Sequence, residues 1–548
     1  MLGLGMDTPL MVSSILEHAA ATSGSTEIVA RTIEGDIHRH TYADAARRSR
    51  KLAKALLALG VRSGDRVGTL AWNTHQHFEL FYGVSGTGAV LHTINPRLFD
   101  EQIVYIVNHA EDAWICVDAS TLPLAQRLAP RLTTVKGWIY LGTKPGPPAT
   151  TLAPLLDYET LLADQDDVYE WPSFDEKQAS TICYTSGTTG MPKGVVNSHR
   201  STILSALIMS SADMIGGYRS GALETVMPIA PLFHGNGWQM VYTAPLSGQK
   251  LVLPGRNFEP DKLYEIMADE GVTLAAGVPT IWLMLVDHLE RHGLKLPKFR
   301  SAMVAGSKPP AALIEALEER HGISVVQAWG MTEALGVTRT TLVPGMDEAA
   351  PEVRRAQTLR QGRIAYGTQL RIVDDAGTVL PRDGVAFGHL QARGHLIAGS
   401  YLKQEPALVD GWLQTGDVAK ISPDGTLELV DRSKDVIKSG GEWISSVEIE
   451  GAALHNPAIA QAAVIGVAHP RWQERPLLVV VRKPGTAVTR EEVLADLKPR
   501  MASWWLPDDV VFVDDIPMTA TGKINKVGLR ERLSDYRLDA DRSPAARD

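Results

Sequence analysis

The sequence contains little cysteine and no long apolar run. Its 548 residues include two cysteines, Cys116 and Cys183. Two thiols so far apart form neither a disulfide framework nor a metal-ligand spacing. No apolar stretch approaches the ~20 residues that a membrane-spanning helix needs. The first residues lack a basic segment followed by an apolar run, so no signal peptide is expected. We therefore predict a reduced, cytoplasmic protein without a membrane anchor.

An excess of positive charge is also missing. The chain has 54 Lys and Arg against 63 Asp and Glu, a formal net charge of −9 at pH 7. This balance argues against a nucleic-acid partner or an anionic membrane surface. A composition that is 44% hydrophobic and 21% charged is typical of a globular protein. The length exceeds the usual size of one hydrophobic core, so at least two domains are expected.

The order of apolar patterns predicts an α/β fold. Thr41 can cap a helix that Gly60 ends, and a strand is expected from Val67 to Trp72. A similar unit of strand, helix and strand spans residues 301–329. Helices that alternate with short apolar strands imply parallel sheets covered by helices.

The pattern of residues changes near 431–445. A turn-rich, β-like stretch runs from Gly367 to Val430, and new helical and strand patterns follow the change. The remaining ~110 residues suffice for a small second domain. The short, strongly charged segment at the boundary is typical of a hinge. We predict an N-terminal domain over 1–431, a hinge over 432–435 and a C-terminal domain over 436–548.

The segment Tyr184–Gly194 has the composition of a phosphate-binding loop. It contains three glycines, four Ser or Thr hydroxyls and Lys193. Backbone N–H groups, hydroxyl donors and a positive charge suit a polyphosphate. It is not a Walker loop, because Gly194 follows the lysine where Ser or Thr is expected. An arbitrary Gly/Ser/Thr run is more often a surface loop, but the Lys-Gly ending after a predicted strand favours phosphate binding.

Three further motifs are ambiguous when each is taken alone. Trp329–Glu333 offers a ring, a glycine, a hydroxyl and a carboxylate, although Glu333 can equally begin a helix. Asp417 can accept hydrogen bonds from ribose hydroxyls, or simply occupy a β-turn. Lys523, in a loop that contains glycine, can reach a phosphate or a carboxylate, or remain solvated. Their order and chemical variety are more specific than any one of them.

Together these motifs resemble the adenylate-forming superfamily of acyl-CoA synthetases, non-ribosomal adenylation domains and firefly luciferases. The motifs that carry the resemblance are Ser186–Gly194, Trp329–Glu333, Thr415–Asp417, Asp431–Gly441 and Gly522–Lys523. Within the superfamily the chain looks most like medium-chain fatty acyl-CoA ligases and methylmercaptopropionate-CoA ligases. That closer likeness is carried by His92–Phe99, Pro231–His234 and Lys438–Ser445.

The resemblance implies both a fold and a reaction. The fold is a large N-terminal domain of helix-covered sheets with a distorted β-barrel subdomain, and a small, mobile α+β C-terminal domain. The reaction converts a carboxylic acid, expected to be a short- or medium-chain fatty acid, into an acyl-adenylate and then into acyl-CoA. ATP, Mg2+ and coenzyme A are therefore expected. Related ligases are often homodimers, so a homodimer is also expected.

The resemblance also assigns residues to the nucleotide. The β- and γ-phosphates are expected at Thr185, Ser186, Gly187, Thr188, Thr189, Gly190 and Lys193. Adenine is expected to stack on Trp329, with Gly306, Ser307, Gly330 and Met331 nearby. Asp417 would take the ribose hydroxyls with support from Arg432. Thr332 would contact the α-phosphate, Glu333 would bind Mg2+, and Lys523 would bridge the α-phosphate and the acid.

The expected chemistry agrees with these assignments. A carboxylate that attacks phosphorus brings two anions together, so Mg2+ and Lys523 must neutralise the growing charge. No general base is needed, because the carboxylate is already ionised at pH 7.

The second half-reaction is expected to use another face of the C-terminal domain, which rotates after adenylation. Lys434 matches the family's hinge position, although taken alone it is more simply a solvent-facing charge. The pantetheine tunnel is expected at Gly440, Gly441, Glu442 and Trp443. We interpret His234 as a gate between the acyl and thiol channels, not as a base. Small or apolar residues are expected around the acyl chain: Trp238, Gly277, Val278, Pro279, Ala305, Gly330 and Ala334.

Other interpretations stay open at this point. Lys308 and the run Ala334–Val337 depart from related ligases beside the predicted acyl pocket. A methylmercaptopropionate-CoA ligase or an aromatic (cinnamate- or benzoate-like) acid–CoA ligase is therefore an alternative. A stand-alone adenylation domain is disfavoured, because no carrier site follows Lys523. A non-catalytic nucleotide-binding protein would not need both Lys523 and Glu333.

Overall fold

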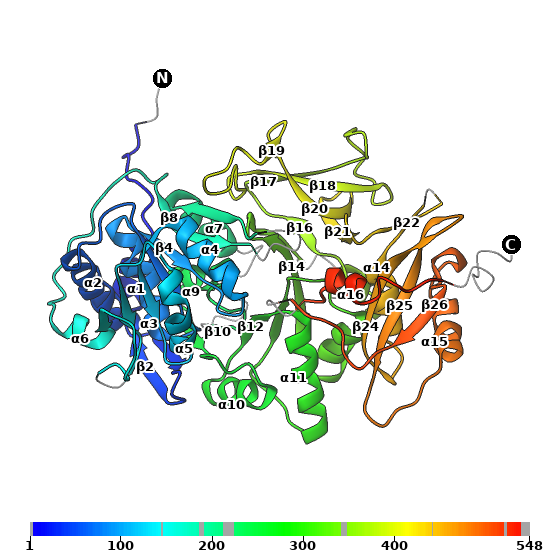
Figure 1. Ribbon diagram of the computed structural model, residues 1–548, viewed down its shortest axis with the longest axis horizontal. Coiled ribbons are helices and arrows are strands. Elements are labelled where there is room, and N and C mark those ends of the chain that lie inside the picture. The colour runs from blue at the N-terminus through cyan, green and yellow to red at the C-terminus, as the bar shows by residue number, and fades with distance from the viewer. Residues whose placement is uncertain are drawn as a thin grey trace.

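The computed structural model describes residues 4–143, 146–185, 191–211, 224–340, 348–440, 442–519 and 523–538. These residues form three sheets with helices between their strands, which confirms the predicted α/β class. In Figure 1 the C-terminal strands and helices, in orange and red, lie beside the larger N-terminal part. No described helix is both long enough and apolar enough to cross a membrane.

One sheet has seven strands in the order β7-β6-β5-β3-β4-β8-β9 and is parallel except at β9. Every residue of β5 is buried, as expected where both faces of a sheet are covered. The strands are β3 (Arg66–Leu70), β4 (Val90–Thr93), β5 (Asp112–Val117), β6 (Gly137–Tyr140), β7 (Leu155–Asp157), β8 (Ala179–Tyr184) and β9 (Gly194–Ser198). The neighbouring helices are α2 (Tyr42–Ala58), α3 (His75–Gly83), α4 (Asp100–Ala110), α5 (Leu122–Leu128), α6 (Tyr158–Ala163) and α7 (His199–Met209).

The predicted cap of α2 is confirmed. The Thr41 hydroxyl accepts a hydrogen bond from the Asp44 backbone N–H, and the Asp44 carboxylate accepts one from the Thr41 N–H. This reciprocal pair satisfies two N–H groups that a helix start leaves without partners. The strand expected from Val67 to Trp72 is β3, which ends at Leu70.

The largest sheet has 14 strands and changes character at β14 (Ser324–Met331). Gln327 pairs with β13 in a parallel ladder, whereas Trp329 pairs with β15 in an antiparallel one. The parallel half contains β1 (Glu27–Arg31), β10 (Thr225–Pro228), β11 (Lys250–Leu253), β12 (Leu274–Gly277) and β13 (Ser301–Val304), with β2 (Ile37–Thr41) at its edge. Trp329 therefore lies where the two halves of the sheet meet.

The antiparallel half stands where the distorted barrel was predicted. Its strands are β15 (Ala334–Arg339), β16 (Gly362–Ile364), β17 (Thr368–Val373), β18 (Phe387–Gly394), β19 (Leu408–Val409), β20 (Trp412–Ile421) and β21 (Thr426–Arg432). The other helices of this part are α1 (Ser13–Ser23), α8 (Gly235–Trp238), α9 (Met240–Leu246), α10 (Pro260–Glu270), α11 (Pro279–His292), α12 (Ala311–Glu315) and α13 (Pro351–Thr358). The helix of the predicted unit over 301–329 begins with α12 and continues as a π-helical turn over Ala316–Arg320.

The C-terminal residues form a separate five-stranded sheet with its own hydrophobic core. That core includes Ile444, Ile449, Val464 and Leu478, all fully buried. The strands are β22 (Ile437–Ser439), β23 (Glu442–Ile444), β24 (Ile459–His469), β25 (Gln473–Arg482) and β26 (Asp509–Phe512). The helices are α14 (Ser446–Ala453), α15 (Arg490–Leu497) and α16 (Lys526–Arg532).

Candidate functional site

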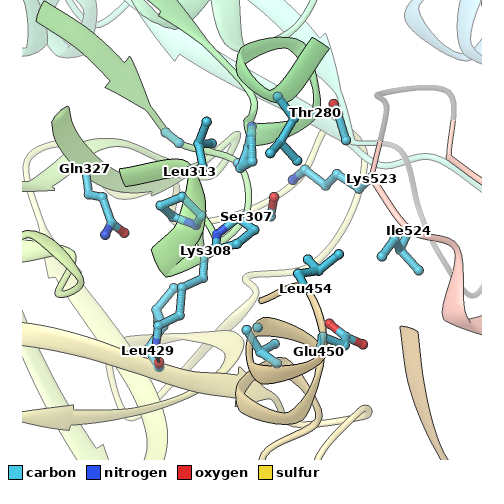
Figure 2. A pocket seen from close by; sticks show the side chains of 18 of the residues that line it. Thr280, Ser307, Lys308, Leu313, Gln327, Leu429, Glu450, Leu454, Lys523 and Ile524 are labelled. Carbon is cyan, nitrogen blue, oxygen red and sulfur yellow. Dashed lines mark hydrogen bonds between the residues drawn. The ribbon is translucent and has the colours of Figure 1, made fainter. Parts of the chain in front are cut away.

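A cavity of about 2040 Å³ lies between the N-terminal part and the C-terminal sheet. Its wall combines α11, the loop after β13, β14 and β21 with α14 and the loop that carries Lys523. Figure 2 shows side chains from both parts facing this space. The volume exceeds the roughly 300–1,000 Å³ of a typical single-ligand pocket, so more than one substrate can bind together.

Lys523 reaches this cavity from the C-terminal part. Its Cε lies 3.5 Å from the point where a Cβ on Gly306 would stand, and Gly306 has a φ of +88° that favours glycine. The lysine backbone N–H donates to Thr519 Oγ1 at 3.1 Å, which fixes the base of its loop. In Figure 2 the side chain points toward Thr280 and Ser307. The structure therefore shows the conformation in which Lys523 faces the N-terminal part.

The Lys523 ammonium is held in an unfavourable environment. Burial lowers its pKa to about 8, Arg432 adds to this effect, and Asp417 opposes it. Among the residues that the structure describes, no carboxylate lies within ion-pair distance of Lys523. A desolvated cation without a counter-ion is suited to receive an anionic ligand.

Asp417 contacts two other residues predicted to bind the nucleotide. Trp329 Nε1 donates to Asp417 Oδ2 at 2.9 Å, and Arg432 Nε lies 2.9 Å from Asp417 Oδ1. The Asp417 side chain is only 4% exposed, and its burial raises its pKa although Arg432 opposes the shift. A carboxylate has about four acceptor sites, so two remain for hydroxyl groups of a ligand.

Glu333 has a partner that sequence reasoning missed. The Tyr401 hydroxyl donates to Glu333 Oε1 at 2.7 Å, and the Lys193 ammonium lies 4.9 Å from the centre of the Tyr401 ring. Tyr401 thus links the end of the glycine-rich loop to the buried carboxylate. It is 68 positions from Glu333 and belongs to no motif, so no local signal could have found it.

The two ends of the glycine-rich loop, Thr185 after β8 and Lys193 before β9, are hydrogen-bonded to each other. The Thr185 N–H donates to the Lys193 carbonyl at 2.9 Å, and the Lys193 N–H donates to Thr185 Oγ1 at 3.3 Å. The Leu402 N–H donates to the carbonyl of Gly194, which fixes the end of the loop. The predicted phosphate ligands Ser186, Gly187, Thr188, Thr189 and Gly190 lie outside the described residues.

Most of the other predicted nucleotide and acyl residues line the cavity. They are His234, Trp238, Pro279, Ala305, Gly306, Ser307, Trp329, Gly330, Met331, Thr332 and Glu333. Leu335 and Gly336, from the run predicted to flank the acyl pocket, line it too, and so does Met209, which was not predicted. Burial lowers the pKa of His234 to about 4, and Lys523 adds to the shift. The imidazole is therefore neutral at pH 7, which suits a gate better than an acid.

Three predicted acyl-pocket residues lie behind this lining. Gly277 ends β12, where a Cβ would meet Trp282 and Ile229 at 3.5 and 3.6 Å. Val278 packs against Gly306, since its Cγ1 lies 3.2 Å from the point where a Cβ on that glycine would stand. Ala334 is fully buried at the start of β15. These residues shape the wall through their neighbours.

Lys308, which departs from related ligases, contacts the neighbouring strand β21. Its ammonium donates to the Leu429 carbonyl on β21 at 3.4 Å, and Figure 2 shows the side chain extended toward Leu429. The charge is thus directed toward the backbone of a neighbouring strand.

The predicted hinge and tunnel residues are separated. Lys434 lines the cavity, whereas Gly440 and Trp443 do not. The Trp443 ring packs against Phe387, at 5.7 Å between ring centres. Gly441 and the Glu442 side chain lie outside the described residues.

The described residues include no cluster of three His, Cys, Asp or Glu side chains arranged to hold a metal ion. Glu333, 7% exposed, is one of several buried carboxylates at the cavity wall, and it follows directly on Thr332 after β14. Mg2+ is commonly bound by one or two protein carboxylates together with substrate phosphates. The donor set therefore fits a magnesium ion that arrives with a nucleotide.

The chain belongs to the family of AMP-binding enzymes. Residues 16–402 match the AMP-binding enzyme family, and residues 448–523 match the AMP-binding enzyme C-terminal domain. The predicted membership of the adenylate-forming superfamily is confirmed.

Two of the curated relatives that the chain resembles are CoA ligases. The chain is 45% identical over 539 residues to 3-methylmercaptopropionyl-CoA ligase of Ruegeria lacuscaerulensis, covering 98% of this chain and 99% of the relative. It is 42% identical over 547 residues to medium-chain-fatty-acid–CoA ligase of Ectopseudomonas oleovorans, covering 99% and 100%. The fold matches that of the anthranilate CoA ligase AuaEII with a TM-score of 0.84 at 24% identity, over 96% of this chain and 98% of that one. The predicted closeness to these two ligase groups is confirmed.

Proposed function

We propose that this protein is an AMP-forming acid–CoA ligase that acts on a short- or medium-chain carboxylic acid. The observation that carries the proposal is the meeting of Lys523 with Asp417, Trp329 and Arg432 at one cavity. Lys523, which has no carboxylate within ion-pair distance among the described residues, faces a preorganised hydrogen-bonding group across a space large enough for a nucleotide and an acid.

The nucleotide is held by the N-terminal part. Asp417 accepts the ribose hydroxyls at its free acceptor sites, while Trp329 and Arg432 keep its carboxylate in position. Adenine packs near Gly306 and Ser307 at the cavity wall. Lys193, the loop that precedes it and Thr332 hold the phosphates. Glu333, oriented by Tyr401, would hold a magnesium ion, which shields phosphate charge when bound.

The first step forms the acyl-adenylate. A carboxylate oxygen of the acid attacks the α-phosphorus, and the bond from that phosphorus to the bridging oxygen of pyrophosphate breaks. Lys523 lies between the two anions and stabilises the negative charge that their approach concentrates. No proton has to be removed, because the acid is already ionised.

The second step forms the thioester. The sulfur of coenzyme A attacks the acyl carbonyl carbon, the thiol proton is lost, and AMP leaves. We propose that residues 436–548 rotate as a domain about residues 432–435, relative to residues 1–431. Rotation withdraws Lys523 and brings Gly440, Gly441, Glu442 and Trp443 to the tunnel for the thiol. Lys434 lies at the pivot, where burial lowers its pKa.

The acyl chain occupies the part of the cavity between His234, Trp238, Pro279 and Ala305. None of these four described residues carries a carboxylate that could pair with an amino group, and most are apolar, so an uncharged chain fits best. The names of the two curated relatives support methylmercaptopropionate and a medium-chain fatty acid as the first acids to test. An aromatic acid is the remaining candidate.

The proposal is tested by AMP formation with ATP, Mg2+ and coenzyme A across a panel of acids. The panel is acetate, butyrate, hexanoate, octanoate, laurate, methylmercaptopropionate and cinnamate. We expect a maximum between butyrate and octanoate or at methylmercaptopropionate. A maximum at cinnamate would replace the acid and keep the reaction. The absence of coenzyme A-dependent turnover with every acid would contradict the proposal.

Two further properties are proposed with the function. Both cysteines are buried free thiols, which supports a cytoplasmic location. A homodimer is proposed from the resemblance alone, and light scattering of the purified protein tests it.

A further inference from the structure

A cluster of side chains outside the cavity joins the hinge to the hairpin β22–β23. The cluster consists of Asp375, Phe387 and His389 of the N-terminal part, Ser433 of the hinge, and Lys438 and Trp443 of the hairpin. None of these six is among the residues that line the cavity. The proposed roles of nucleotide and acid therefore leave them unexplained.

His389 is the centre of this cluster. Its Nε2 donates to Asp375 Oδ1 at 2.8 Å, and its Nδ1, which the tautomer with a hydrogen on Nε2 leaves as an acceptor, lies 3.1 Å from Ser433 Oγ. Its pairing with Asp375 thus leaves the imidazole in the one tautomer that can also hold the Ser433 hydroxyl. One side chain of β18 thereby contacts a residue of the proposed hinge.

The same histidine contacts the hairpin. The Trp443 ring lies 5.4 Å from the His389 ring and 5.7 Å from Phe387, in an edge-on arrangement with the latter. Lys438 lies 4.9 Å from the centre of the Trp443 ring and 3.5 Å from Asp375 Oδ2. Asp375 thus receives a hydrogen bond from the histidine and an ion pair from the hairpin lysine.

We propose that Asp375 and His389 are positioning residues that hold the thiol-side hairpin away from the cavity while the acyl-adenylate forms. We call the cluster of six residues the latch; the proposal rests on the domain rotation of the proposed function. Rotation about residues 432–435 moves the hairpin relative to β18, so the contacts of Trp443 and Lys438 must break before the thiol tunnel can form.

The latch is suited to reversible opening. The side chains of Asp375, Lys438 and His389 are 64%, 46% and 27% exposed, and exposed pairs of this kind contribute little individually. A few such contacts shift a two-state equilibrium by about three- to tenfold. Loss of the latch should therefore slow acyl-adenylate formation, during which the hairpin is held against β18, without stopping it.

The first experiment measures the two half-reactions separately. Acyl-adenylate formation is followed in a single turnover without coenzyme A, and thioester formation is started from supplied acyl-adenylate. For His389→Ala we expect the first rate to fall about three- to tenfold and the second to remain equal or to rise. Asp375→Asn should give a smaller change in the same direction. His395→Ala, an exposed histidine just after the same strand, is the matched control and should change neither rate.

The second experiment reads the conformation without any reaction. Both native cysteines are buried, so dyes attach to cysteines introduced at the exposed positions Lys295 and Glu491. Energy transfer in the unliganded protein should show a population ratio shifted three- to tenfold toward the rotated state in His389→Ala. Identical distances in parent and variant, or an equal fall of both half-reactions, would overturn the latch. If the parent protein forms no acyl-adenylate, the proposed function fails, and the distance measurement decides the latch alone.

Discussion

The two sides of the cavity hold their charges in opposite ways. On the N-terminal side Asp417 is buried, and each of its oxygens contacts a donor, Trp329 or Arg432, at 2.9 Å. On the C-terminal side Lys523 has a lowered pKa and no described carboxylate within ion-pair distance. Under the proposed function, the Asp417 side is in place before substrate binds, whereas the anions of the substrates would supply the partner of Lys523. This difference suits a nucleotide that binds to a fixed site and a lysine that arrives and leaves.

The largest effect is expected when the positive charge of Lys523 is removed. Lys523→Ala should lower the rate of acyl-adenylate formation by about 10²–10³-fold, the usual loss when a preorganised transition-state contact is deleted. The measurement is pyrophosphate release in a single turnover at saturating ATP and acid. Thermal unfolding provides the control, since a lysine without an ion pair should leave the midpoint almost unchanged. A rate within twofold of the parent would remove Lys523 from the chemistry.

Removal of the paired carboxylate should have the next largest effect. Asp417→Ala leaves the Trp329 N–H and the Arg432 guanidinium without their acceptor, a change that costs roughly 2–5 kcal/mol where a buried charge pair is truncated. We expect kcat/KM for ATP to fall by about 10²-fold and the unfolding midpoint to drop. Asp417→Asn retains an acceptor for Trp329 and should lose less of both. Equal behaviour of the two variants would argue against the shared hydrogen-bond geometry.

The pH dependence of adenylate formation tests the role of the Lys523 charge in a second way. A lysine with a pKa of about 8 is charged below that value and loses its charge as the pH rises through it. The value of kcat/KM for adenylate formation should therefore fall about tenfold per pH unit above pH 8, since this parameter reports the free enzyme. Lys523→Arg keeps its charge at every accessible pH. The variant should be slower than the parent but should lose this alkaline fall; its persistence would assign the titration to another group.

The smallest effect is predicted for Tyr401, which contacts both Glu333 and Lys193. Tyr401→Phe removes one hydrogen bond to Glu333, which is worth about 0.5–1.5 kcal/mol. Adenylate formation should slow by about two- to twelvefold, and the Mg2+ concentration for half-maximal rate should rise. Tyr366→Phe, at an exposed tyrosine of the same part, serves as the comparison variant. An unchanged Mg2+ requirement would contradict the proposed role of Glu333.

The sequence predicted the fold well where local patterns determine it. The cap of α2 and the strand–helix–strand unit at 301–329 lie close to their predicted positions, and helices and strands follow the predicted change near 431–445. Short-range hydrogen bonds and apolar periodicity are sufficient for such elements. The junction of parallel and antiparallel pairing at β14 was not predicted, because it depends on which strands lie on either side of β14, and local patterns do not specify strand partners.

The site was predictable only in part, for a similar reason. Lys523, Asp417 and Trp329 were identified from sequence motifs, and the structure places all three at one cavity. Tyr401 and His389 could not be found in this way, because each acts through partners remote in the sequence. The placement of Gly277 and Ala334 behind the wall likewise depends on tertiary packing.

The most direct test of the account is to give purified acyl-adenylate and coenzyme A to Lys523→Ala. If Lys523 serves adenylation alone and is withdrawn before the thiol attacks, the variant should form acyl-CoA at close to the parent rate while it fails to make its own adenylate. A loss of acyl-CoA formation as large as the loss of adenylate formation would contradict the division of labour between the two sides of the cavity.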